Sequence, residues 1–322
     1  MLGKFVNWVR TPPIWRKLLT LAVIGGAIGL AVFWVVTIPG TVPASALPAY
    51  TPDAANGKVI FFAGGCSSCH ATVGQDDKTK LGGGFGLKSP FGTFYAPNIS
   101  SDPKDGIGSW TEQQFVTAMV KGTSPNGTHY FPAFPYGSYA HMNYNDVRDL
   151  FAFMKTLPAV QGKAREHDVP FPFNVRRSLG GWKFLFFDEK QFKPDPTKSA
   201  AWNRGAYLVN GPGHCAECHT PRNFMGGMKS GQRFAGGPSP EGEGWVPNIT
   251  QHALKSWTEQ DFVDLLESGM TPDGDFVGGE MTKVVRNTSQ LSEADRKAMA
   301  TYLKSLPAVE GPPKPAKKKP GV

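Results

Sequence analysis

The four cysteines of the chain lie in two copies of one pattern, Cys-x-x-Cys-His. The copies are Cys66-Ser67-Ser68-Cys69-His70 and Cys215-Ala216-Glu217-Cys218-His219. Cysteines three positions apart share one face of a helical turn, so both thiols can bond to the vinyl groups of one porphyrin. The histidine follows on the same face and can bind the iron as proximal ligand. The pattern therefore predicts two covalently bound haem c groups, with His70 and His219 as iron ligands.

Three other interpretations of the paired cysteines are weaker. A thioredoxin-type redox pair is expected beside a β-α-β pattern, which neither copy has. A zinc ion shared by two such pairs usually needs about 15–20 residues between them, whereas 145 residues lie between Cys69 and Cys215. A structural disulfide within each pair would leave the histidine after both pairs unexplained.

The motifs belong to a longer internal repeat. Ala96-Pro97-Asn98-Ile99-Ser100 matches Val246-Pro247-Asn248-Ile249-Thr250 at an offset of 150. The offset is 147 between the Ser-Trp-Thr-Glu-Gln segments that begin at Ser109 and Ser256, and 149 between the Leu-Pro-Ala-Val segments that begin at Leu157 and Leu306. A regular offset predicts one duplicated domain.

Each copy predicts the same order of helices. A first helix begins near Gly57 or Gly205 and leads into the cysteine motif, and a long Gly/Pro-rich loop follows. A second helix begins with the capping boxes Thr111-x-x-Gln114 and Thr258-x-x-Asp261. The last helix is predicted at about 145–157 and 292–306, where apolar residues recur with helical spacing and a Leu-Pro pair ends the helix.

Methionines are the candidates for the sixth iron ligands. A His/Met pair raises the potential of a haem iron, whereas an open position favours ligand chemistry. In the first copy Met142 lies in a loop before the last helix, while Met119 and Met154 lie in amphipathic helices where methionine usually fills the core. In the second copy we expect Met281, in the loop between the two final helices, with Met270 as the fallback.

The remaining histidines are expected on the surface or in supporting positions. They are His129, His141, His167, His214 and His252. His141 precedes Met142 and His214 precedes Cys215, so either could instead complete a bis-histidine haem.

An uncharged segment, Leu18 to Pro39, precedes both motifs. At ~1.5 Å per residue it covers a hydrocarbon core of ~30 Å. Basic residues precede it and no charge follows until Asp53, so the positive-inside rule places the rest of the chain outside the cytoplasm. Ala44-Ser45-Ala46 matches the A-x-A pattern of a cleavage site, so a cleaved signal peptide is the alternative. The apolar run, however, exceeds the ~7–15 residues of a typical signal core. We expect a retained single-pass anchor.

Composition narrows the function. The charge is +8, but the basic residues do not cluster with aromatic ones, which argues against a nucleic-acid partner.

Residues 163–200 are too aromatic for a flexible linker. We expect these rings to staple two domains together, with a docking surface for a partner subunit as the alternative. The rings are Phe171, Phe173, Trp182, Phe184, Phe186, Phe187 and Phe192.

Beyond the motifs, the chain resembles the c-type cytochrome subunits of bacterial periplasmic alcohol, aldehyde and gluconate dehydrogenases. The resemblance covers about residues 50–310. It is carried by Leu81-Gly-Gly-Gly, Ser89-Pro-Phe-Gly-Thr-Phe-Tyr-Ala-Pro-Asn-Ile99, Phe131-Pro-Ala-Phe-Pro-Tyr136, and Phe171-Pro-Phe-Asn-Val-Arg-Arg177 through Trp182 to Phe187.

The resemblance implies the class I cytochrome c fold, in which the first and last helices cross beside the haem. It places Gly57 and Gly205 at this crossing, facing Phe153 and Tyr302, although a glycine at an ordinary helix start fits the sequence equally well. It also implies Met142 and Met281 as axial ligands. That family usually carries three haem motifs and passes electrons towards membrane quinone. This chain has two, so transfer to a soluble cytochrome or a terminal oxidase is equally consistent.

We therefore predict a mostly α-helical protein with one N-terminal transmembrane helix and two tandem class I cytochrome c domains. The expected parts are an N-terminus and anchor (1–50), a first domain (51–162), an aromatic linker (163–200), a second domain (201–310) and a basic tail (311–322). The predicted role is electron transfer at the periplasmic side of a bacterial inner membrane, with a dehydrogenase, terminal oxidase or soluble cytochrome as partner. The alternative is a di-haem redox enzyme such as a peroxidase or thiosulfate dehydrogenase, for which no catalytic constellation is evident.

Overall fold

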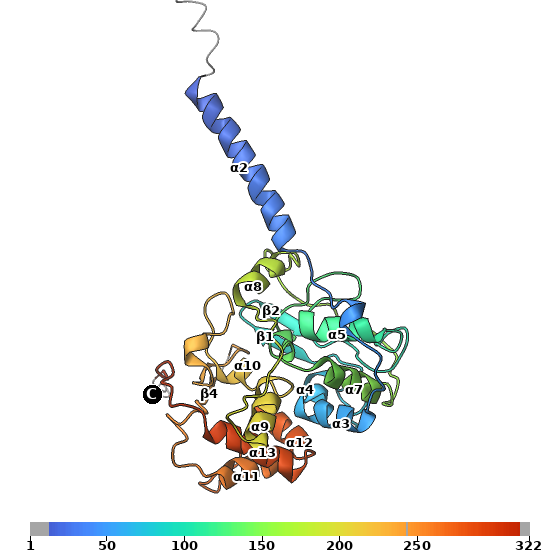
Figure 1. Ribbon diagram of the computed structural model, residues 1–322, viewed down its shortest axis with the longest axis vertical. Helices are drawn as coiled ribbons and strands as arrows, with labels where there is room; N and C mark the ends of the chain where they lie inside the picture. Colours follow the sequence, from blue (N-terminus) through green and yellow to red (C-terminus); the bar gives the residue numbers. More distant parts are fainter. Residues whose placement is uncertain (1–12, 243, 316–322) are drawn as a thin grey trace, which may run out of the picture.

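The computed structural model describes residues 13–242 and 244–315. One long helix, α2 (Ile14–Val36), projects from the folded body (Figure 1). Within the described residues it is the one helix long and apolar enough to cross a membrane, and none of its residues is buried. The predicted apolar segment began at Leu18, so the helix starts four residues earlier. Two of the basic residues that precede the apolar segment, Lys4 and Arg10, lie outside the described residues, as do Lys317, Lys318 and Lys319 of the predicted basic tail.

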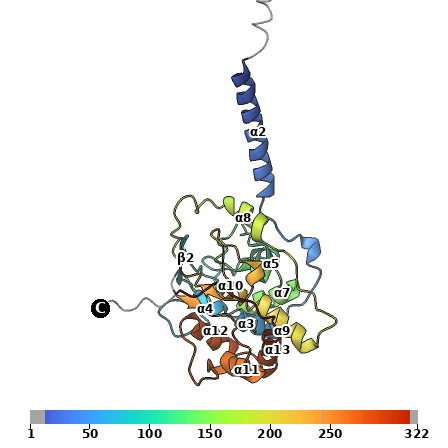
Figure 2. The ribbon, with the colours of Figure 1, turned by 90° about the vertical axis from the view of Figure 1, so that its left-hand side faces the viewer.

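The two repeats fold into two similar helical units. The first contains α3 (Ala54–Ala63), α4 (Cys66–His70), β1 (Gly86–Ser89), β2 (Gly92–Tyr95), α5 (Glu112–Lys121), α6 (Tyr136–Tyr139) and α7 (Tyr144–Met154). The second contains α9 (Ala200–Asn210), α10 (Ala216–His219), β3 (Gly237–Pro238), β4 (Trp245–Val246), α11 (Glu259–Ser268), α12 (Glu280–Thr288) and α13 (Glu293–Lys304). Between them lies α8 (Ser178–Phe186), and short 3-10 turns occupy Ala44–Ala46 and Ser230–Gln232. The second unit, with α11 and α13, forms the end of the molecule remote from α2 (Figures 1 and 2).

The first and last helices of each unit cross at a glycine. A Cβ atom on Gly57 would lie 2.0 Å from the carbonyl oxygen of Asp149 and 2.9 Å from Cβ of Phe153. A Cβ atom on Gly205 would lie 1.9 Å from the oxygen of Ala298 and 3.0 Å from Cβ of Tyr302. Both glycines lie inside their helices, so the predicted crossing is confirmed and the helix-start interpretation is wrong.

Both predicted capping boxes are present. The Thr111 side chain accepts a hydrogen bond from the Gln114 amide, and the Gln114 side chain accepts one from the Thr111 amide. Thr258 and Asp261 make the same reciprocal pair at the start of α11. These caps fix where the second helix of each unit begins.

We expect Thr111→Ala and Thr258→Ala each to lower the free energy of unfolding by about 1 kcal/mol, because each leaves a helix-terminal amide without its side-chain acceptor. Denaturant unfolding followed by circular dichroism measures the loss. Thr197→Ala, in an exposed turn outside any helix, serves as the control. An effect no larger than that of Thr197→Ala would contradict the capping role.

The structure departs from the predicted elements in three places. Each Gly/Pro loop contains a short antiparallel hairpin, β1–β2 or β3–β4. The linker contains α8. Met281 was predicted in a loop, but it lies in the first turn of α12.

Candidate haem-binding site

The two cysteine motifs form single helical turns, as their spacing predicts. Helix α4 runs from Cys66 to His70, and α10 begins directly after Cys215. Gly65 precedes the first motif with φ +55°, which brings the chain sharply into the turn. None of the four cysteines forms a disulfide.

Each motif histidine is held by a backbone carbonyl. His70 Nδ1 lies 2.9 Å from the oxygen of Pro97, and His219 Nδ1 lies 2.8 Å from the oxygen of Pro247. Because a carbonyl only accepts, Nδ1 carries the proton and Nε2 keeps its lone pair for a metal. Burial lowers the pKa of both imidazoles, which favours the neutral form that binds iron.

Two glycines let the carbonyl groups of Pro97 and Pro247 lie close to the motif histidines. Gly83 donates its amide hydrogen to the oxygen of His70, and Gly236 does the same for His219. Both have positive φ, and a Cβ atom on either would lie about 2.5 Å from the Pro97 or Pro247 segment. The duplicated loops thus repeat the orientation of the histidine as well as the motif.

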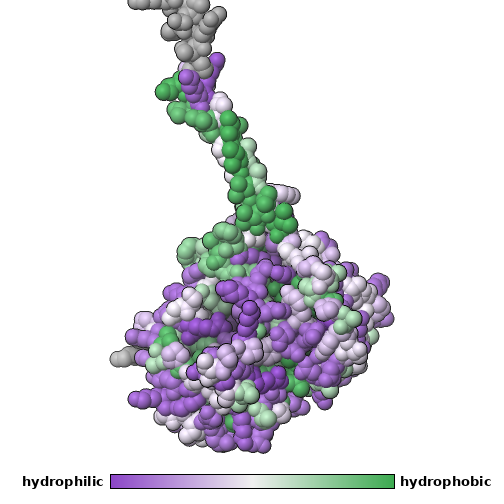
Figure 3. Space-filling model, viewed as in Figure 1, coloured by the Kyte–Doolittle hydropathy of each residue, from purple (hydrophilic) through white to green (hydrophobic). Residues whose placement is uncertain are grey.

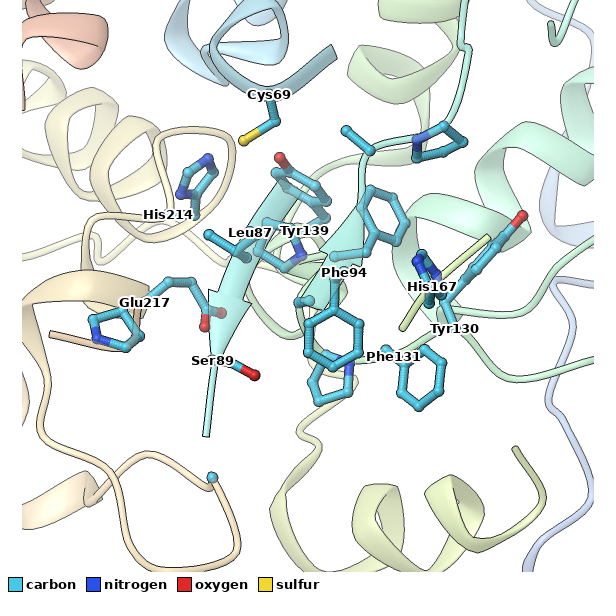
Figure 4. A pocket seen from close by; sticks show the side chains of 18 of the residues that line it. Cys69, Leu87, Ser89, Phe94, Tyr130, Phe131, Tyr139, His167, His214 and Glu217 are labelled. Carbon is cyan, nitrogen blue, oxygen red and sulfur yellow. The ribbon is translucent and has the colours of Figure 1, made fainter. Parts of the chain in front are cut away.

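A cavity of about 1910 Å³ opens beside the first motif. Its wall includes Cys66, Cys69 and His70, together with Cys218 of the second motif. Figure 4 shows Cys69 at one end, Tyr139 and His214 close to it, and the rings of Phe94 and Phe131 further along. The cavity has the size, the apolar wall, the thiols and the free imidazole nitrogen that a covalently attached porphyrin requires.

The thiols do not suit other chemistry. Burial raises the pKa of Cys66 and of Cys215 to about 12, which disfavours the thiolate that a thioredoxin-type redox pair needs. Among the residues that the structure describes, no cluster of three or more His, Cys, Asp or Glu side chains could hold a metal ion. The thioredoxin interpretation is therefore disfavoured by burial as well as by the flanking sequence.

Hydrogen bonds beside the first motif join the two units. The His214 ring lies 3.2 Å from the oxygen of Gly64, two residues before Cys66. Asn287 of α12 accepts a hydrogen bond from Ser67 at 3.1 Å and donates one to Ser68 at 3.0 Å, and both serines belong to the first motif. These contacts fix the separation of the two haem attachment sites.

The two methionines predicted as iron ligands do not line the large cavity. Met142 is fully buried and shares a small cavity with Cys66, Tyr139 and Pro212. Met281 is half-buried on α12, next to Glu280, whose side chain does reach the large cavity. The methionines in the described cavity wall include Met119 and Met154, which were predicted as core residues.

The other histidines have distinct surroundings. His129 contacts the oxygen of Thr37 at 3.0 Å, His141 contacts the oxygen of Lys190, and His252 is exposed. His167 lies in the cavity wall against Phe94 and accepts a hydrogen bond from the Tyr95 amide. His167 could not be singled out from the sequence, because it lies in the interdomain segment, far from either motif.

Two haem-attachment turns on two crossed-helix domains define a c-type cytochrome with two covalently bound haem c groups. The cytochrome c family model matches residues 54–158 and 203–307. The chain belongs to the cytochrome c family.

Relatives agree with this class. A diheme cytochrome c-type protein of Cereibacter sphaeroides is 47% identical over 299 residues, which is 91% of this chain and 97% of that protein. The fructose dehydrogenase cytochrome subunit of Gluconobacter japonicus is 36% identical over 83% of this chain. The cytochrome c subunit of an alcohol dehydrogenase (quinone) of Gluconobacter oxydans is 36% identical over 76% of it. The chain spans only 54% and 52% of these two subunits. The protein is an electron-transfer cytochrome, as predicted.

Proposed function

We propose that this protein is a membrane-tethered di-haem cytochrome that relays electrons at the periplasmic face of a bacterial inner membrane. The observation that carries the proposal is the shared cavity: Cys66 and Cys69 of one motif and Cys218 of the other lie in the same wall. Two haems attached this close together suit rapid transfer from one to the other.

The residues of the chain have definite tasks in this relay. Each haem, when bound, cycles between Fe(III) and Fe(II). His70 and His219 hold the iron through Nε2 while Pro97 and Pro247 fix their rings. The packed helices and apolar wall exclude water, which limits the reorganisation that accompanies each change of charge.

We further propose Met142 and Met281 as the sixth ligands. Each lies between the second and the last helix of its unit, and Met142 lies beside Cys66 in the small cavity. In the resemblance to dehydrogenase cytochromes these positions carry the axial methionines. Neither side chain lines the large cavity in the present packing.

Helix α2 is proposed as an uncleaved anchor. It has 23 residues, and its most apolar 18-residue stretch has a mean hydropathy of 2.4, enough to cross a bilayer at ~1.5 Å per residue. The basic residues at its N-terminal side support a location of the haem domains outside the cytoplasm, by the positive-inside rule. The domain limits at about residues 50, 162, 200 and 310 follow the repeats and stay part of the proposal.

The proposed electron donor is a periplasmic dehydrogenase, because several relatives are cytochrome subunits of such enzymes. The proposed acceptor is a terminal oxidase or a soluble cytochrome. Purification of the full chain in mild detergent, with mass analysis of co-migrating chains, should recover a dehydrogenase subunit. The proposal would be contradicted if the chain were recovered alone and if membranes supplied with dehydrogenase substrates did not reduce its haems.

A further inference from the structure

The linker helix α8 is fastened to the last turn of α2. Arg177, at the start of α8, donates from Nε to the Thr37 hydroxyl at 2.8 Å and from its guanidinium to the oxygen of Trp34 at 2.5 Å. The same guanidinium lies 4.2 Å from the centre of the Trp34 ring. A Cβ atom on Gly180 would lie 2.6 Å from Cα of Thr37, so α8 and the end of α2 are in direct backbone contact.

The contact between α8 and the end of α2 also packs against the first haem domain. Thr37 is 1% exposed, and its oxygen contacts His129. Lys183 of α8 is buried and donates to the oxygens of Lys121 and Gly122 at the end of α5. Helix α8 therefore keeps one orientation relative to both α2 and the haem domain.

The linker aromatics divide into two groups. Some staple the domains together, as predicted: Trp182 donates to the oxygen of Met225, Phe186 packs on Gly227, and Phe192 packs on Tyr207. Phe173 and Phe187 pack on Phe91 and Tyr136 of the first domain. Phe171 (79% exposed) and Phe184 (74%), with the neighbouring Leu185 (58%), form what we call the foot surface.

The foot surface continues the apolar surface of α2. The large cavity beside the first cysteine motif extends to this contact, since its wall also includes Gly29, Val32 and Val36 of α2 together with Phe184 and Leu185 of α8. Figure 1 places α8 at the base of α2, and the hydrophobic colour in Figure 3 runs from α2 onto the body there. From Gly29 to Val36 a helix rises about 10 Å. The end of this cavity between α2 and α8 thus reaches about 10 Å along the part of α2 that is proposed to lie in hydrocarbon.

We propose that the foot surface is a second membrane contact, with Phe184 and Leu185 inserted among the acyl chains of the outer leaflet beside α2. This inference rests on the proposed anchor. Phe184 and Leu185 are exposed beside the part of α2 that is proposed to lie in hydrocarbon, so lipid is the occupant that the position of the foot surface favours. Aromatic and aliphatic side chains beside a helix end are typical of residues that lie in a membrane interface.

The contact would set the orientation of the haem domains. A single helix end allows a tethered body to tilt, whereas α2 and the foot surface together define a plane. Helices α11 and α13 would then face away from the bilayer (Figures 1 and 2). A partner subunit or a second copy that covers the foot surface is the competing occupant.

Lipid photo-cross-linking tests the proposal on the full-length holoprotein in nanodiscs. The probe is a phosphatidylcholine with a diazirine in its acyl chain, and adducts are located by peptide mass spectrometry. We expect adducts on α2 and on residues 171–186. The double variant Phe184→Ser/Leu185→Ser should lower adducts on 171–186 on the order of tenfold or more, since both apolar anchors are lost. Phe276→Ser removes a ring of similar exposure (64%) in the loop between α11 and α12, and should change nothing.

The outcomes separate this inference from the proposed anchor. Adducts on α2 without adducts on 171–186 overturn the foot surface and leave the anchor standing. Absence of adducts from both overturns the anchor as well. Cross-links from residues 171–186 to another protein chain in place of lipid also overturn the proposal. Linear dichroism of the haem absorption in oriented bilayers provides a second measurement: the wild-type protein and Phe276→Ser should show one ordered tilt, which the double variant loses.

Discussion

Gly57→Ala should destabilise the first haem domain by about 3 kcal/mol or more, because overpacking at a rigid contact is costly. The new Cβ atom would lie 2.0 Å from the oxygen of Asp149, and neither helix backbone can move without opening the core. Gly205→Ala should do the same to the second domain, where the distance to the oxygen of Ala298 is 1.9 Å. Guanidinium unfolding followed by haem absorption and circular dichroism measures both losses.

The matched control is Gly231→Ala. Gly231 is exposed, and a Cβ atom there would meet nothing within 4 Å. Its midpoint of unfolding should stay at the wild-type value. If Gly57→Ala behaved like Gly231→Ala, the helices would not cross at the position that defines the fold.

Met281→Leu and Met142→Leu should each remove one iron–sulfur bond if the proposed ligation holds. Leucine keeps the apolar volume but cannot bind iron, so the affected haem should lose its sulfur-to-iron charge-transfer band. Its potential should fall on the order of 0.1 V, since loss of an axial methionine removes the ligand that raises it. The vacant position should then bind carbon monoxide. Redox titration, near-infrared spectra and carbon monoxide difference spectra measure these changes.

Met119→Leu is the control for this pair, because Met119 lines the large cavity from within α5 and was predicted as a core residue. It should leave both potentials and both bands unchanged. Loss of a band in Met119→Leu, with Met142→Leu unaffected, would show that the first haem takes its ligand from α5. Rapid carbon monoxide binding by the unaltered protein would instead favour an open haem and the redox-enzyme alternative.

Much of the fold follows from local patterns in the sequence. Thr111 and Gln114 could be placed at a helix start because a capping box needs only residues three apart. Val147, Leu150, Phe151 and Met154 were recognisable as one helix face from their spacing, and all four are at most 3% exposed. The crossing at Gly57 could be stated only through the resemblance, because the sequence does not show which backbone approaches a glycine.

The elements that were missed depend on tertiary contacts. Helix α8 contains Gly180 and Gly181, which disfavour a helix on propensity alone; its contact with Thr37 and the buried Lys183 hold it in place. Helix α12 had a readable signal in Met281, Val284, Val285 and Thr288, which follow helical spacing, but the preceding glycines suggested a loop.

The site was predictable as far as covalent attachment, but its surroundings were not. The motifs identify the thiols and the proximal histidines, because that chemistry is fixed by spacing over five residues. The bonds of His70 to Pro97 and of Asn287 to the first motif join segments 27 and about 220 residues apart. No local pattern encodes such contacts. The internal repeat aligned Pro97 with Pro247 and so indicated only that the two positions correspond.

The central claim is that this polypeptide carries two haem groups bonded through its four cysteines. The intact mass of the purified mature chain, measured after extraction with acidified acetone, tests it most directly. The mass should exceed that of the polypeptide by two haem groups, and tryptic peptides that contain Cys66–His70 and Cys215–His219 should each carry one. A mass equal to the bare polypeptide, or haem that leaves with the solvent, would contradict the account.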